Sequence, residues 1–297
     1  KITKNRMLII NYLGVANSNV KEKVGERVDN AILLHGAFNG EDRARLERML
    51  KDNPPSLLVG TQAIEISLDI DYDAIYTELA PLDALLQRFG RVNRHRFWHD
   101  PPRPCYVFSE RNDKDKFIYA NPEVIANTLN VLKQIREKNE GVIDEKQLQA
   151  LIDFVYPDFC ERDKVIFEDT KRYLKNAISR LAPMEQSEQS EADFYKQFDG
   201  EKVLPVQLYP RFVGMMQNFD FIGAQRLKVS IRKGEAAKWL RTGILESRLF
   251  AIESTAGKNA RPIEIKVMVI KLPYSNELGL QKSAEPITGS FFDERIL

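Results

Sequence analysis

Residues 87–94 bring together four polar side chains suited to binding phosphate: Gln87, Arg88, Arg91 and Arg94, with no lysine among them. A helix that starts after Pro81 and continues through the cluster would place Gln87, Arg91 and Arg94 at i, i+4 and i+7, on one face. Guanidinium groups can grip two phosphate oxygens at once, which favours arginine over lysine for this task. We expect a phosphate-binding face, and the alternative is a solvated surface cluster of ion pairs.

The elements that would position this cluster alternate between strand and helix. Short apolar runs predict strands at the positions given at the end of this paragraph, and helical periodicity lies between them. Asn39 or Gly40 caps a helix that runs through Leu50, and Asn53-Pro54-Pro55 ends it. Alternation of this kind predicts an α/β fold, a parallel sheet with helices on both faces and ligands at the carboxyl ends of the strands. The expected strands are 6–12, 31–34, 57–59, 74–79 and 105–109, and residues 15–27 are an expected crossover helix.

After the last predicted strand of this sheet, the strand–helix alternation ends. Two amphipathic helices are expected around Val124–Ile135 and Leu148–Val155, and the polar run 183–192 is typical of a linker or of the start of a solvated helix. Period-two patterns at Leu227–Ile231 and Ile263–Val269 predict strands, and a short helix is expected around 236–240. These features indicate a small terminal α+β unit.

Composition excludes several classes. The 297 residues carry a net charge of +1, so a nucleic-acid site would be a local patch rather than a general positive field. Two distant cysteines and three histidines give no disulfide framework and no metal-ligand cluster, so no metal site is expected. No apolar run is long enough for a membrane span and no secretory leader is present, so we expect a cytoplasmic protein with no membrane partner. The start at Lys1 leads us to expect a piece of a longer protein.

Three sequence segments together resemble a known family. GTQAIEISLDID (60–71) and QRFGRVNRHR (87–96) look like motifs V and VI of superfamily 2 helicases, and LLHGAFNGEDR (33–43) resembles motif IV. The residues in these motifs are similar to those of the CRISPR-associated helicase-nuclease of type I systems. The resemblance covers roughly the first third of the chain. It implies that residues 1–115 form the second RecA-like domain, 116–190 a helical linker, and 191–297 an accessory carboxyl-terminal α+β domain.

The resemblance also implies roles for particular residues. Arg91 and Arg94 would act as arginine fingers on ATP, and Gln87 would orient the phosphate or its water. Asp69 would contact the nucleotide ribose or the arginine helix, with a turn or capping role as the alternative. Arg88 would either bind nucleotide or pair with a carboxylate such as Asp69 or Asp71. Asp71 and Asp73 are assigned to the turn, because no third ligand accompanies them to suggest a metal.

A second set of residues would contact nucleic acid. Gly60, Thr61 and Gln62 would offer backbone amides and a hydroxyl to a strand phosphate, although a plain turn is the alternative. Ser67 would cap locally or touch the strand. His35 would line the strand channel, with a satisfied turn histidine as the alternative.

The sequence has no phosphate loop, no acidic box and no His-Asp pair for nuclease metals. The expected function is therefore the carboxyl-terminal half of an ATP-dependent single-stranded DNA helicase or translocase in CRISPR interference, an antiviral defence. ATP with Mg²⁺ would be held mainly by the absent first RecA-like domain, and the isolated chain would be inactive. Expected partners are single-stranded DNA, that first domain, an HD-type nuclease domain or subunit, and the CRISPR surveillance complex. The alternatives are another superfamily 2 RNA or DNA helicase fragment, or a non-catalytic nucleic-acid-binding adaptor.

Overall fold

The computed structural model describes most of the chain. The described residues are 6–10, 30–65, 68–95, 101–110, 118–119, 121–138, 140–158, 160–180, 200–252 and 262–288. Within them, no helix is both long and apolar enough to cross a bilayer. The expected crossover helix at 15–27 lies outside them.

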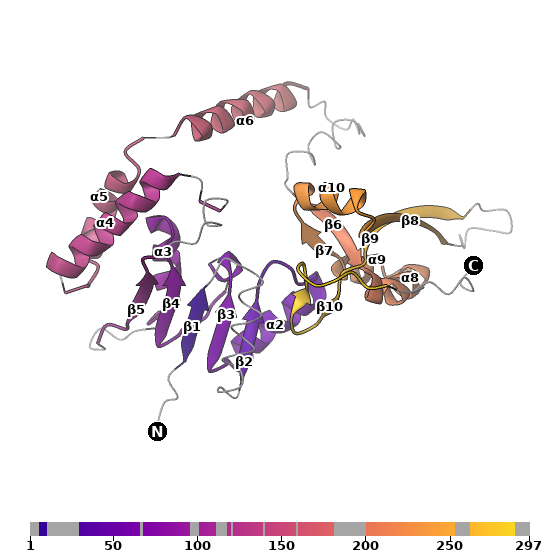
Figure 1. Cartoon of the computed structure of the whole chain (residues 1–297), viewed down its shortest axis with the longest axis horizontal. Coiled ribbons are helices and arrows are strands. Elements are labelled where there is room, and N and C mark those ends of the chain that lie inside the picture. Colours follow the sequence, from indigo (N-terminus) through magenta and orange to yellow (C-terminus); the bar gives the residue numbers. More distant parts are fainter. Residues whose placement is uncertain are drawn as a thin grey trace.

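A five-stranded parallel sheet forms the first part of the molecule (Figure 1). Its order is β2-β3-β1-β4-β5, and every neighbouring pair is parallel. Every residue of β3 is buried, whereas β1 and β4 alternate buried with partly buried residues. The expected α/β fold class is confirmed. The strands are β1 (Met7–Ile10), β2 (Ala31–Leu34), β3 (Leu57–Gly60), β4 (Ala74–Glu78) and β5 (Cys105–Phe108).

Helix α2 (Gly40–Asp52) begins and ends where the sequence predicts. Asn39 is its N-cap, and the Asn39 side-chain oxygen accepts a hydrogen bond from the Asp42 amide at 2.7 Å. Glu41 and Asp42 in the first turn interact favourably with the helix dipole. Leu46 and Leu50 are buried against the sheet core.

Helix α3 (Leu82–Phe89) is shorter than expected, which corrects the prediction of one helical face for the arginine cluster. Gly90 is its C-cap, and the chain then turns to form a parallel bridge between Val92 and Tyr72. The Tyr72 amide donates to the Arg91 carbonyl, and the Asn93 amide donates to the Tyr72 carbonyl. These bonds draw the backbone out of the helix, so Gln87, Arg91 and Arg94 do not share a helical face.

Three helices follow the sheet. The α4 helix packs on α3 through Val124, Ile125 and Val131, and α5 adds Val155 to the same cores. The sequence pattern predicts α4 and α5 but not α6, which extends from α5 toward the terminal part of the chain (Figure 1). The helices are α4 (Pro122–Lys138), α5 (Leu148–Val155) and α6 (Glu161–Arg180).

The terminal part is α+β, with a sheet of order β7-β6-β9-β8. The expected strands at 227–231 and 263–269 are present as β7 and β9, and the expected helix at 236–240 is present as α10. The elements are β6 (Glu201–Pro205), α8 (Tyr209–Gln217), α9 (Phe221–Arg226), β7 (Val229–Ile231), α10 (Lys233–Arg241), β8 (Leu245–Ile252), β9 (Ile263–Ile270), β10 (Tyr274–Ser275) and β11 (Gly279–Leu280).

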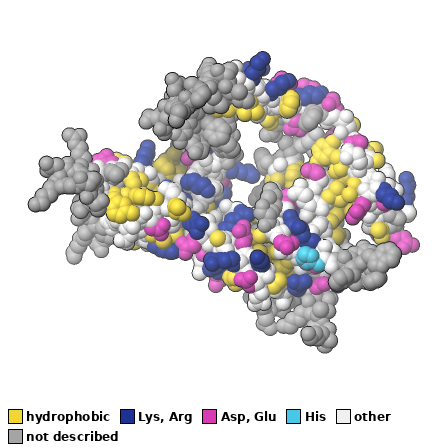
Figure 2. All heavy atoms as spheres, turned by 180° about the vertical axis from the view of Figure 1, so that it is seen from behind, with side chains coloured by type: hydrophobic (Ala, Val, Ile, Leu, Met, Phe, Trp, Pro, Cys, Tyr) yellow, Lys and Arg dark blue, Asp and Glu magenta, His cyan; other side chains and the backbone are white. Residues whose placement is uncertain are grey.

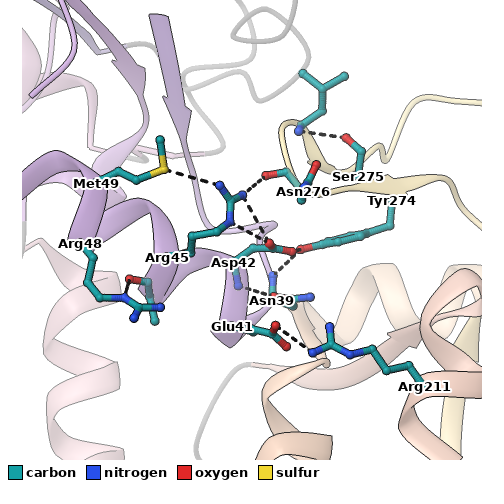
Figure 3. Close-up of polar contacts among 12 residues, drawn as sticks. Asn39, Glu41, Asp42, Arg45, Arg48, Met49, Arg211, Tyr274, Ser275 and Asn276 are labelled. Atoms are coloured by element: carbon teal, nitrogen blue, oxygen red, sulfur yellow. Dashed lines mark hydrogen bonds and ion pairs between the residues drawn. The ribbon is translucent and has the colours of Figure 1, made fainter. Parts of the chain in front are cut away.

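The β10–β11 hairpin joins the terminal part to the parallel sheet (Figure 3). The Tyr274 hydroxyl donates to Asp42 Oδ2 at 2.6 Å and accepts from the Asn39 amide at 3.2 Å. Arg45 Nη2 donates to the Asn276 carbonyl at 2.7 Å. Hydrogen bonds from α2 to the hairpin therefore fix the two parts against each other.

Helix α8 adds an ion pair to this contact, between Arg211 and Glu41 at 2.9 Å (Figure 3). The Leu280 amide donates to the Ala37 carbonyl at 2.9 Å. Ala37, although it follows β2, is buried in the core of the terminal part beside Trp239 and Ile231. On the face in Figure 2, basic and acidic side chains are interspersed, in keeping with the net charge near zero.

Candidate nucleotide and strand site

The loop after β3 is held in a tight bend at the carboxyl edge of the sheet. A Cβ on Gly60 would lie 2.0 Å from Ile64 Cδ1 and 2.6 Å from the Leu34 carbonyl oxygen, so only glycine fits there. Thr61 caps the short 3₁₀ helix η1 (Gln62–Ile64), its hydroxyl accepting from the Ala63 amide at 3.4 Å. Thr61 and Gln62 are half-buried and lie at the ligand-binding edge of a parallel sheet.

Arg88 lies inside the protein, with an exposed fraction of 0%. Its Nε donates to Glu65 Oε1 at 2.8 Å, and its Nη1 donates to the Thr77 hydroxyl at 2.6 Å. Nη2 donates to the Tyr119 hydroxyl at 3.1 Å. A guanidinium with no exposed surface does not reach a nucleotide, so the structure corrects that prediction and favours the structural alternative. The carboxylate partner is Glu65, not Asp69 or Asp71.

Burial shapes the protonation of this pair. The low-polarity surroundings raise the pKa of Glu65 to about 7, with the Asp83 charge acting in the same direction. The same burial lowers the pKa of Arg88 to about 10. The Arg88 fork satisfies its donors with a carboxylate, two hydroxyls and the Glu78 carbonyl, which compensates for removing the charge from water.

Arg91 bonds the backbone of the segment that follows η1, at Glu65 and Leu68. Its Nη1 donates to the Leu68 carbonyl, and its Nη2 donates to the Glu65 carbonyl at 2.5 Å. Its Nε is buried and has no hydrogen-bond partner among the described residues. Burial, followed by the neighbouring Arg94 charge, lowers the pKa of Arg91. Because both Nη groups are bonded to these carbonyls, Arg91 holds the backbone at Glu65 and Leu68 in place.

Arg94 presents its charge at the surface. Its Nε lies 3.0 Å from Asp69 Oδ1, and the two side chains are 40% and 72% exposed. The Arg94 amide donates to Asp71 Oδ1 at 2.8 Å, which fixes the turn that carries the arginine. Gln87 is exposed on the last turn of α3. An exposed ion pair contributes little to stability, so Arg94 can exchange Asp69 for another anion at small cost.

His35 is buried beneath the hairpin rather than open to a strand. Its Nδ1 accepts from the Ala37 amide at 3.1 Å, so Nε2 carries the proton and donates to the Leu278 carbonyl at 3.0 Å. Burial lowers the pKa of His35 to about 4, which keeps the ring neutral. An imidazole with both nitrogens occupied and 6% exposure does not line a channel, so the structure corrects the predicted nucleic-acid contact. The prediction for Ser67 lies outside the described residues.

The structure therefore gathers the β3 loop, Glu65, Arg91 and the Asp69–Arg94 pair at one edge of the sheet. The sequence favours a structural salt bridge for Glu65, and the structure confirms one, to Arg88; sequence reasoning did not identify Tyr119, the other partner of Arg88. The available signal was a carboxylate between two isoleucines, Ile64 and Ile66, which indicates a buried partner for a charge. No cluster of His, Cys, Asp and Glu in the described ranges could hold a metal ion.

Comparison with known proteins supplies the family. Residues 7–97 match the family model described as CRISPR-associated nuclease/helicase Cas3, C-terminal. A putative CRISPR-associated nuclease/helicase Cas3 of Methanocaldococcus jannaschii is 31% identical over 211 residues, which is 67% of this chain and 27% of that protein. The CRISPR-associated endonuclease/helicase Cas3 of Thermus thermophilus is 38% identical over 99 residues, 31% of this chain and 10% of that protein.

Among solved structures, the crystal structure of T. fusca Cas3-ATP is similar with a TM-score of 0.43 and 24% identity, over 57% of this chain and 22% of that one. The chain thus spans about a quarter of the M. jannaschii relative and less of the T. thermophilus one. The resemblance noted in motifs IV, V and VI is confirmed by the family model and these relatives, and the chain belongs to the Cas3-like helicase family as a carboxyl-terminal portion, through residues 7–97.

Proposed function

We propose that this chain is the carboxyl-terminal half of an ATP-dependent single-stranded DNA helicase or translocase that acts in CRISPR interference. In this proposal residues 1–115 are the second RecA-like domain, 116–190 a linker and 191–297 an accessory domain. The observation that carries it is the exposed Arg94 guanidinium, which is held beside Asp69 at the ligand-binding edge of a parallel sheet.

ATP is the proposed nucleotide, and the donor set fits a polyphosphate. Arg94 has an exposed, exchangeable charge, and Arg91, which is partly exposed, carries a second charge near it. Both offer donors and no acceptors, which suits an anion. ATP and its Mg²⁺, held mainly by the first RecA-like domain, would supply the phosphoryl group that is transferred to water.

The arginines would act by charge placement. As a phosphoryl group leaves, charge spreads over its equatorial oxygens, and a forked cation there lowers the barrier. Arg94 would leave Asp69 for the phosphate, and Gln87 on the neighbouring turn would orient the phosphate or water. Arg91 holds the Glu65 and Leu68 carbonyls. When the cleft between the two RecA-like domains closes on the nucleotide, a movement of Arg91 would therefore shift the loop after β3.

The strand would run past the β3 loop. Gly60 is buried and lets the backbone pass close to Ile64 and Leu34. The next residues, Thr61 and Gln62, are half-buried polar groups without charge. Neutral donors of this kind position a phosphate backbone without reading its bases. Proposed partners are the first RecA-like domain, an HD-type nuclease domain or subunit, and the CRISPR surveillance complex; cytoplasmic location is also a proposal.

The test is Arg94→Ala in the complete enzyme. We expect ATP turnover to fall by about 10³-fold or more, as for other arginine fingers, while affinity for single-stranded DNA stays within about threefold of wild type, because Arg94 is not placed on the strand path. Arg103→Ala is the matched control, since Arg103 also forms a half-exposed pair, with Asp73 at 2.9 Å. Turnover retained in Arg94→Ala would contradict the assignment and favour a non-catalytic adaptor.

A further inference from the structure

A hollow of about 500 Å³ lies where the terminal part meets the start of α2, away from the arginine cluster. Its walls include Lys202 on β6, Arg226 and Lys228 at the end of α9, and Phe221 and Ile222 at the start of α9. Gly40, the first residue of α2, forms the remaining side, and a Cβ there would lie 3.4 Å from the Arg226 carbonyl oxygen. The hollow is large enough for a nucleotide-sized ligand.

The charge of the hollow is of one sign. Three of its lining side chains are cationic and none is a carboxylate. Lys202 Nζ donates to the Ser230 hydroxyl at 2.7 Å, a neutral partner that leaves its charge uncompensated. Lys228 Nζ lies 5.3 Å from the centre of the Phe212 ring, and burial together with the Lys202 charge lowers the pKa of Lys228. Like charges held this close favour an anion between them.

The hollow is also lined by two exposed apolar side chains, one turn before Arg226 on α9. Phe221 and Ile222 are 46% and 74% exposed, so both are accessible to a ligand in the hollow. The Phe219 ring meets the Phe221 ring edge-on at 6.1 Å, and Phe219 is held at φ 60°, in the left-handed region that few non-glycine residues adopt. This conformation ends α8, because the Phe219 amide donates to the Met216 carbonyl and the Asp220 amide donates to the Met215 carbonyl.

We propose that this hollow binds one nucleotide unit of a single strand of nucleic acid, with the phosphate against Lys202, Arg226 and Lys228 and the base against Phe221 and Ile222. Cations beside an exposed aromatic ring are the combination that binds single strands without reading sequence. The identity of the ligand as a strand rests on the proposed function; the location of the hollow on the terminal part does not. The strand would thus contact the terminal part as well as the β3 loop.

The test measures binding of a fluorescent oligothymidylate to this chain by anisotropy over a range of salt concentrations. In Arg226→Gln/Lys228→Gln we expect affinity to fall at least tenfold and the salt slope to drop by about 1.4, since each lost phosphate contact on a single strand removes about 0.7. Phe221→Ala should weaken binding by roughly 5- to 100-fold with the salt slope unchanged. Lys171→Gln/Arg172→Gln on α6 is the control, because it removes the same charge from an exposed surface.

Two further arms separate the possible outcomes. Arg226→Gln/Lys202→Gln tests the hollow without altering Lys228, which packs on Phe212. Thr61→Val tests the strand path of the proposed function: if it weakens binding while both hollow variants bind like wild type, the hollow proposal is overturned and the proposed function stands.

Binding lost in the hollow variants but not in Thr61→Val supports the hollow alone. Wild-type protein that binds no strand overturns both, and equal competition by tripolyphosphate and oligothymidylate reduces the hollow to a simple anion site and overturns the base contact.

Discussion

Glu65 and Arg88 form an ion pair at 2.8 Å in which the arginine has no exposed surface and the carboxylate side chain is 10% exposed. The pair connects the loop after β3 to α3, and the Tyr119 hydroxyl joins it from the segment before α4. Arg91 bonds the carbonyl of the same Glu65. Glu65 is therefore the residue through which the proposed strand loop and the proposed nucleotide arginines are mechanically joined.

Removing the Glu65 carboxylate should be costly to stability. Glu65→Ala leaves a buried guanidinium without its counter-charge, and we expect the free energy of unfolding to fall by about 3–5 kcal/mol. Glu65→Gln keeps an acceptor and should lose less. Urea unfolding of the chain measures both. Glu47→Gln, which removes an exposed partner of Arg43, is the control and should change stability by less than about 0.5 kcal/mol.

His35 should make stability depend on pH. Its pKa is lowered to about 4 in the folded protein from 6.5, so the unfolded chain binds a proton more readily between these values. The stabilising effect is complete above pH 6.5 and is lost as pH falls toward 4, by about 3 kcal/mol in total. Urea unfolding at pH 7 and pH 4.5 measures the loss. His35→Asn keeps an acceptor for the Ala37 amide but does not titrate, and an unchanged pH slope in this variant would contradict the assignment.

Gly279 should be intolerant of a side chain for two separable reasons. It has φ +67°, and a Cβ there would lie 2.8 Å from the Ala37 carbonyl oxygen. Gly243 has nearly the same φ, +71°, but a Cβ added there would have no neighbouring atom within 4 Å. Gly243→Ala should cost about 1–2 kcal/mol for the backbone conformation alone, and Gly279→Ala should cost about 1–3 kcal/mol more because it forces the hairpin off α2. Urea unfolding of the two variants is the measurement, and equal losses would show that the hairpin is not tightly seated.

Tyr274 should contribute to the same contact through its hydroxyl. Tyr274→Phe removes the donor to Asp42 and the acceptor for the Asn39 amide, and we expect a loss of about 1.5–3 kcal/mol because one partner is charged. Tyr156→Phe is the matched control, since the Tyr156 hydroxyl also bonds a carboxylate, on Asp83, but in an exposed position. Thermal unfolding of the two variants is the measurement. If Tyr156→Phe lowers the free energy of unfolding as much as Tyr274→Phe does, the contact of Tyr274 with Asp42 and Asn39 contributes no more than an exposed hydrogen bond.

Local signals predicted much of the fold. The strand Ala31–Leu34 and the start and end of α2 agree with the sequence pattern. In each case the signal is local: a short apolar run for the strand, and a capping Asn and a following proline pair for the helix. Helix α3 was predicted too long. Its helical periodicity continues past Gly90, but the bridge between Val92 and Tyr72 depends on residues about 20 positions apart and overrides it.

The partners of buried charges were harder to predict for the same reason. The sequence predicted that His35 and Arg88 contact nucleic acid or nucleotide. In the structure their polar atoms bond to groups distant in sequence, Leu278 and Glu65 respectively. A single sequence shows that a polar residue follows a buried strand, but not which distant backbone will cover it. Arg94 and Asp69 remain at the surface, where the predictions made for them stay open to the experiments above.

The bond between His35 and the Leu278 carbonyl spans 243 positions of the chain. Ribosomes add about 5–20 residues each second, so the first partner waits roughly 12–50 s for the second to be made. During that interval the apolar face of Leu33, Leu57 and Val59, which Leu278 later covers, is open to unintended association. Translation speed over the codons between His35 and Leu278 and chaperone supply should therefore govern the yield of native protein in cells.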